Sequence, residues 1–119
     1  MGETEFIRGA DGVRIGHLVE RSHEMSGDLV KAVVDVERGI MAIGGAMHAD
    51  EEAALIEDGS SQPDLWGINL YPDDYGTDAF VEFDSMINLR PAQKNRSRSV
   101  EDPALRERIE RLVDRLVQP

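Results

Sequence analysis

Apolar residues recur every three or four positions in two parts of the chain, a spacing that is typical of one face of a helix. Near residues 15–26 the repeat includes Ser22 as a small polar member and ends before Gly27. Toward the end of the chain, Asp102 can cap a helix whose first turn holds Pro103. The apolar stripe of this second helix is long: Leu105, Ile109, Leu112, Val113 and Leu116. The spacing therefore predicts a helix at each of these places.

Residues 48–63 predict a further, shorter helix. Asp50 is its expected N-cap, Glu51 and Glu52 suit the positive end of the helix dipole, and Gly59 suits the left-handed position after the last turn. A helix this short needs tertiary packing to persist. Its expected inward side is modest: Ala49, Ala53 and Ile56, helped by Leu55.

Other stretches alternate apolar and polar residues or are rich in β-branched residues, which predicts strands. They cover residues 30–36, 40–43, 65–72 and 80–90. The last of these is the longest, and alternation divides its side chains between two faces. One face holds Val81, Phe83, Ile87 and Leu89, and the other holds Phe80, Glu82, Asp84, Met86, Asn88 and Arg90.

The elements follow one another in the order α-β-β-α-β-β-α. This order predicts an α+β fold, with a four-stranded, mainly antiparallel sheet and helices packed on one face. A chain of 119 residues fits a single domain over residues 1–119. Residues 1–14 are expected to form a flexible tail or a small hairpin.

Composition and charge exclude several classes of protein. The chain has no cysteine, which excludes disulfides, thiolate catalysis and cysteine-ligated metal sites. It has no apolar run long enough to span a membrane, and its first residues do not resemble a secretion signal, so we expect a cytoplasmic protein. The net charge is −11, with −14 on residues 1–86 and +3 on residues 87–119. An acidic surface of this kind repels nucleic acid and anionic membranes.

The polar face of the 80–90 strand is the first candidate site. Lys31, Asp35, Glu37 and Asn69 from other strands are expected to extend it. Three interpretations remain open: a solvated sheet face with cross-strand ion pairs, the floor of a ligand site, or a polar interface between subunits. Within an enzyme, Asp84 or Glu82, together with His48, would act as acid or base.

The loop after Pro91 is the second candidate, because it concentrates donors without a nearby acidic residue. Such a loop suits a phosphate or a carboxylate, and it also suits pairing with the acidic surface of the same or another subunit. No second histidine stands at metal-ligand spacing from His48, so we predict no metal site and no cofactor. The candidate residues for anion binding or an interface are Asp84, Asn88, Arg90, Gln93, Asn95, Arg96 and Arg98.

Several phrases of the sequence resemble a family of small prokaryotic proteins known only as a domain of unknown function. They are VKAVVDVE, HADEEAALIEDGS, LWGINLYP, EFDSMINLRP and NRSRSVEDP. The resemblance covers about residues 28–117, and about residues 1–24 depart from the pattern. It implies a compact domain, and it brings no activity, cofactor or established site.

We favour a non-catalytic binding domain that self-associates into a homo-oligomer through the polar sheet face and the basic loop. One alternative is an enzyme or ligand-binding domain for a small anionic molecule, held by Arg90, Arg96 and Arg98. A second alternative is an antitoxin-like binder of a basic protein, suggested by the acidic composition. Whether the protein is an enzyme stays open at this stage, although the absence of nucleophile and metal motifs argues against it.

Overall fold

The computed structural model describes residues 3–9, 12–25 and 27–119 of the chain. Within these residues the main sheet has five strands in the order β1-β4-β3-β5-β6, and every neighbouring pair is antiparallel. A separate pair, β2 with β7, runs parallel. The strands are β1 (Glu5–Ile7), β2 (Val13–Arg14), β3 (Val30–Asp35), β4 (Ile40–Ile43), β5 (Leu65–Leu70), β6 (Val81–Glu82) and β7 (Val117–Gln118). The helices are α1 (Ile15–Met25), α2 (His48–Glu57) and α3 (Pro103–Leu116).

The prediction of four strands is wrong, and the order of elements differs from the expected one, because residues 5–7 belong to the main sheet. β1 pairs with β4 along its length, with Phe6 opposite Ala42. Ile7 lies in the core on one face of the sheet, while Phe6 packs against the core on the other. This segment therefore forms the edge strand next to β4, rather than a tail or a hairpin.

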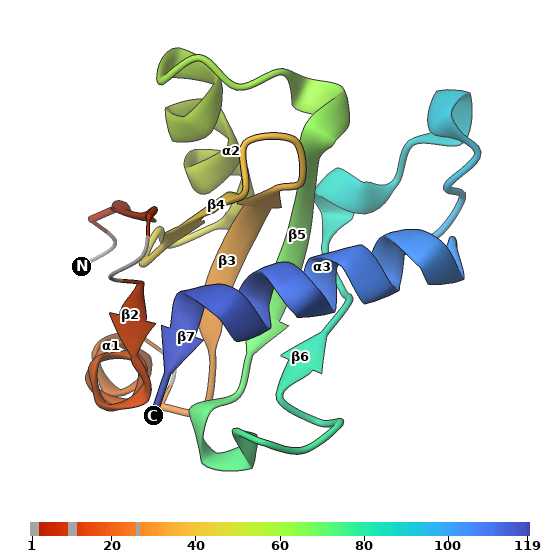
Figure 1. Cartoon of the computed structure of the whole chain (residues 1–119). Helices are drawn as coiled ribbons and strands as arrows, with labels where there is room; N and C mark the ends of the chain where they lie inside the picture. Colours follow the sequence, from red (N-terminus) through yellow and green to blue (C-terminus); the bar gives the residue numbers. More distant parts are fainter. Residues whose placement is uncertain (1–2, 10–11, 26) are drawn as a thin grey trace.

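The helices cover both faces of the sheet, which corrects the expectation that they share one face. On the first face, α1 and α3 pack on the apolar side chains of β3, β4 and β5. On the second face, α2 and the 3₁₀ turn η3 (Met86–Asn88) cover a smaller apolar cluster around Val33 and Leu65. Figure 1 shows α3 crossing in front of the sheet and α2 behind it. The sheet is therefore the middle layer, and each of its faces has a core.

The C-terminal helix forms as its sequence predicts. The carboxylate of Asp102 accepts a hydrogen bond of 2.9 Å from the backbone N–H of Ala104, and Pro103 occupies the first turn. The predicted stripe is buried at Ile109, Leu112, Val113 and Leu116, and Leu105 is partly buried against the same core. Local sequence signals are sufficient here because the cap and the stripe agree.

The second helix turns a different side toward the sheet from the one its apolar residues predict. Its buried residues are His48, Glu51 and Leu55, and the expected inward residues Ala49, Ala53 and Ile56 are exposed or partly exposed on the outer side. The predicted N-cap is also wrong, because Met47 takes the N-cap position three residues before Asp50 and makes no side-chain capping bond within the described residues. Two ionisable side chains thus lie inside, while alanines and an isoleucine face outward.

The long strand predicted over residues 80–90 is wrong. β6 ends at Glu82, and the chain then turns through η3 and a second 3₁₀ turn, η4 (Pro91–Gln93). Phe80, Val81 and Phe83 pack on the first core, but Ile87 packs on the second. The alternation of apolar and polar residues here therefore reflects contacts with two different cores rather than one extended strand.

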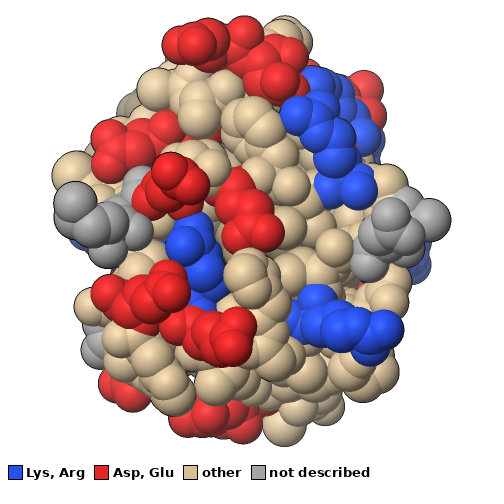
Figure 2. All heavy atoms as spheres, turned by 90° about the vertical axis from the view of Figure 1, so that its left-hand side faces the viewer, with Lys and Arg blue, Asp and Glu red and all other residues tan. Residues whose placement is uncertain are grey.

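Acidic side chains predominate on the side of the molecule shown in Figure 2, which carries the N-terminal elements. Some of them are paired: Arg21 of α1 lies 3.2 Å from Glu24 and 3.7 Å from Glu5, and His17 lies 2.8 Å from Glu5. None of the described helices is long and apolar enough to cross a membrane.

Candidate functional site

Residues 84–98 form a compact loop that folds back on itself. Backbone hydrogen bonds join Arg90 to Asn95 in both directions, and the N–H of Ser85 donates to the carbonyl of Arg98 at 3.0 Å. The loop can lie against β5 because position 67 is a glycine: a Cβ atom there would stand 2.6 Å from the side chain of Ser85. The predicted site residues within the loop therefore divide into groups with different surroundings.

The side chain of Asn88 bonds to the backbone of β5 at a point where the predicted 80–90 strand does not form. Its side-chain amide accepts from the backbone N–H of Gly67 at 2.8 Å and donates to the Gly67 carbonyl at 2.9 Å. The same amide nitrogen donates to the carbonyl of Arg98 at 3.0 Å. Asn88 is fully buried, so these bonds hold the loop on the sheet. Because its amide already makes these bonds within the protein, Asn88 is not placed to bind a ligand.

Arg90, Gln93 and Asn95 also bond to the protein itself. Arg90 is buried and donates to the carbonyls of Ile87 and Leu65, and its guanidinium lies 4.7 Å from the centre of the Trp66 ring. Burial lowers the pKa of Arg90. Gln93 contacts Arg90 at 3.3 Å, and the buried amide of Asn95 donates to the backbone carbonyls of Asn88, Ser97 and Ser99.

Arg96 and Lys94 are exposed on the outside of the loop. Arg96 contributes its backbone N–H to Glu101 at 3.1 Å. Lys94 occupies the left-handed conformation with a φ of 62°. These two cations stay on the surface, and they do not converge with Arg90 on a common centre.

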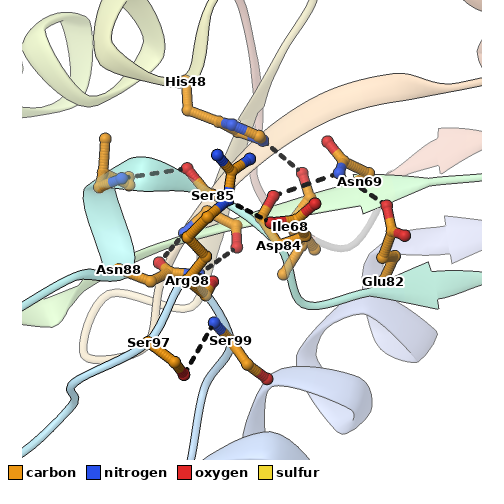
Figure 3. A network of polar contacts seen from close by, with 12 residues as sticks. His48, Ile68, Asn69, Glu82, Asp84, Ser85, Asn88, Ser97, Arg98 and Ser99 are labelled. Atoms are coloured by element: carbon orange, nitrogen blue, oxygen red, sulfur yellow. Dashed lines mark hydrogen bonds and ion pairs between the residues drawn. The ribbon is translucent and has the colours of Figure 1, made fainter.

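A second group of predicted residues does come together, at the other end of β5 (Figure 3). Asn69 donates to Glu82 at 2.9 Å and to the carbonyl of Asp84 at 3.2 Å, and Arg98 donates to the Asp84 carboxylate at 2.6 Å. His48 of α2 reaches the carbonyl of Ile68 at 2.8 Å. Asn69 lies roughly 13 Å along β5 from Leu65, whose carbonyl binds Arg90, because the two are four residues apart and each strand residue spans about 3.3 Å. The predicted arginines therefore belong to separate places.

The His48 ring is largely buried, and burial lowers its pKa despite the bond to Ile68. The contact with a carbonyl requires Nε2 to carry the proton, so Nδ1 of the neutral ring is an acceptor. Glu82 also accepts from the hydroxyl of Tyr71 at 2.8 Å, and burial together with this carboxylate raises the pKa of Tyr71 to about 12.

Glu51 completes this group, and the sequence did not indicate its role. It is fully buried one turn after His48, and its Oε2 accepts from the N–H of Gly45 at 2.9 Å. Burial raises the pKa of Glu51 well above its ordinary value of 4.5. Gly45 permits this arrangement, because a Cβ atom there would stand 2.6 Å from the Glu51 side chain. The helical spacing of His48, Glu51 and Leu55, which places the three on one face of α2, is the sequence signal that could have indicated the burial of Glu51.

Of the four residues expected to extend the polar face, Lys31 and Asn69 lie there as direct cross-strand neighbours. Asp35 is fully buried at the end of β3, and Glu37 lies beyond the strand and pairs with Arg108 of α3, so these two do not join it. Asn69 in turn lies opposite Glu82. The group thus combines a row of polar residues across three strands with two buried residues of α2. Among the residues that the structure describes, no three His, Asp or Glu side chains are placed to hold a metal ion.

The family described as "Protein of unknown function (DUF5674)" matches residues 12–116 of this chain. The match confirms the resemblance to a family of unknown function. It begins at residue 12 rather than 28, so the expectation that about residues 1–24 depart from the family is wrong from residue 12 onward. No curated protein and no solved structure matches the chain.

Proposed function

This chain belongs to the DUF5674 family of proteins of unknown function, and we propose that it is an interaction domain that self-associates through the outer side of α2 and η3. We call this the α2–η3 surface. The observation that supports the proposal is the orientation of α2, which buries His48 and Glu51 beside Leu55 and turns Ala49, Ala53 and Ile56 outward. The residues of the surface are Met47, Ala49, Ala53, Ile56, Met86 and Leu89.

The large apolar side chains that are exposed in the described part of the chain all belong to this surface. Met47 and Met86 are 58% and 63% exposed, and Ile56 and Leu89 are each 44% exposed. Fully burying one such side chain contributes about 1.5–3 kcal/mol. A partner that covers several of them therefore gains a substantial part of the free energy of a specific contact.

A second copy of the chain is the occupant that we propose. Two-fold dimers place the same surface of each subunit in contact, so an apolar surface can serve as its own partner. The alanines at positions 49 and 53 allow two helices to approach closely. Two subunits with a net charge of −11 repel each other, and salt screens this repulsion.

Salt dependence separates this surface from an interface built on the basic loop. An apolar contact between two acidic subunits becomes stronger as salt increases. A contact between Arg96 of one subunit and the acidic surface of another becomes weaker under the same change. The two arrangements therefore predict opposite trends.

Light scattering after gel filtration, between about 50 mM and about 500 mM NaCl, tests the proposal. We expect a dimer whose fraction rises with salt, and we expect Ala53→Glu in α2 to give a monomer. Ala104→Glu in α3 is the matched control, because it introduces the same charge at another exposed helical alanine. A monomer at every salt concentration, or equal effects of the two variants, would refute self-association through the α2–η3 surface.

A further inference from the structure

We propose that the group around His48 is a binding site for a small carboxylate that also carries a hydrogen-bond donor, such as a short hydroxy acid. We call it the His48 site, and its residues are Lys31, His48, Glu51, Asn69 and Arg98. This goes beyond the proposed self-association, because it assigns a ligand to a different set of side chains.

Two buried polar atoms of this site have no hydrogen-bond partner among the described residues. They are Oε1 of Glu51 and Oδ1 of Asn69, and their residues are fully buried and 7% exposed, respectively. The opposite atom of each side chain is satisfied, by Gly45 in one case and by Glu82 and Asp84 in the other. Leaving a buried polar atom unpaired is unfavourable, so both atoms favour a polar ligand.

The residues that carry these atoms belong to neighbouring elements on one face of the sheet. His48 and Glu51 are one turn apart on α2, and both are on its buried side. His48 bonds to the carbonyl of Ile68, the residue before Asn69. Burial is the main cause of both pKa shifts, raising the pKa of Glu51 and lowering that of His48, and the charge of Lys31, which lies opposite Asn69 across the sheet, acts on both groups.

Two cations at this site have donors to spare. Within the described residues, no carboxylate lies within ion-pair distance of the half-buried Lys31. Arg98 bonds to Asp84 through Nε alone, and Figure 3 shows the rest of its guanidinium turned toward His48. An ammonium and a guanidinium bind carboxylates by charge-assisted hydrogen bonds.

The acceptors of the site specify the second feature of the ligand. Oδ1 of Asn69 has no donor among the described residues, and Nδ1 of the neutral His48 ring can accept a hydrogen bond, but a bare carboxylate supplies a donor to neither atom. A hydroxyl or ammonium group next to the carboxylate would supply it. Burial raises the pKa of Glu51, which favours the protonated carboxyl, and a protonated carboxyl can donate to the ligand.

The surrounding charges favour a singly charged anion. Glu82 and Asp84 border the site, so a phosphate dianion would meet stronger repulsion than a carboxylate. A divalent cation would meet Lys31 and Arg98 instead. The combination of two cations, two carboxylates and unpaired acceptors thus fits a small polar carboxylate best.

NMR titration of the ¹⁵N-labelled full chain with glycolate, acetate and ethylene glycol tests this site. We expect glycolate to shift the amide signals of Gly45 and the Asn69 side chain saturably, with a dissociation constant on the order of a millimolar for so small a molecule. Acetate lacks the hydroxyl donor and should bind about tenfold more weakly, and ethylene glycol lacks the charge and should not bind measurably.

The two lysines of the chain provide a matched pair of variants. Lys31→Met should weaken glycolate binding at least about tenfold, whereas Lys94→Met should leave it unchanged. Both variants are first shown to be folded by their amide spectra. The proposal is overturned if glycolate produces no saturable shift at Gly45 and Asn69, or if the two lysine variants lose binding equally. Repeating the titration on Ala53→Glu separates this result from the state of self-association.

Discussion

Replacing Asn88 by alanine should destabilise the protein strongly, because this amide is the connection between the loop and β5. The change removes hydrogen bonds to the N–H of Gly67, the carbonyl of Gly67 and the carbonyl of Arg98. The side chain is fully buried, so the backbone groups of Gly67 and Arg98 that it bonds would be left unpaired and without free access to water. At about 1 kcal/mol for each of these bonds, the expected loss is about 3 kcal/mol.

Equilibrium unfolding in urea, followed by far-UV circular dichroism, measures this loss. Proteins of this size have a free energy of unfolding of about 6–18 kcal/mol, so the variant should still fold and give a complete transition. The midpoint should fall while the slope stays the same, since the surface exposed on unfolding hardly changes. The measured difference is then a change in stability.

Gln62→Ala is the control, because it removes an exposed amide that has no side-chain hydrogen bond within the described residues. We expect it to change the free energy of unfolding by less than about 0.5 kcal/mol. A loss below about 1 kcal/mol for Asn88→Ala would refute the reasoning, because water would then replace the amide at little cost.

Two further predictions concern buried ionisable residues. Glu51 has a raised pKa in the folded protein, so above pH 4.5 the unfolded chain holds fewer protons than the native one and stability falls as pH rises. Glu51→Gln should remove this slope and be more stable than the wild type at pH 8; parallel pH profiles in urea unfolding would contradict this. Arg90→Met should cost about 3 kcal/mol, because it leaves Glu52 and the carbonyl of Leu65 without their partner. Thermal unfolding at pH 7 checks this value, and a midpoint equal to that of the wild type would exclude it.

The prediction for residues 80–90 failed because a polar side chain can replace backbone pairing. Alternation correctly identified Val81 and Glu82 as strand residues. It could not indicate that Asn88 would pair with Gly67 through its amide, which lets the backbone leave the sheet after Glu82. The partner is some twenty residues away in the sequence, so no local pattern contains this information.

The candidate site was predicted in part for a related reason. The polar face correctly included Lys31 and Asn69, since strand periodicity determines which residues share a face. For Glu51 the sequence indicated only that an acidic residue suits the positive end of a helix dipole, and this gives no sign of burial. Its burial depends on Gly45, which leaves room for the side chain and donates a hydrogen bond to it.

The sequence by itself determined the helices, most of the strands and the faces of β3, because these follow from spacing, caps and side-chain shape within a few residues. α3 is the clearest case, with its cap at Asp102 and its apolar stripe. Only the tertiary structure decided which side of α2 faces the sheet and where β6 ends. Both depend on buried hydrogen bonds between distant residues, which are formed or lost only when the layers pack.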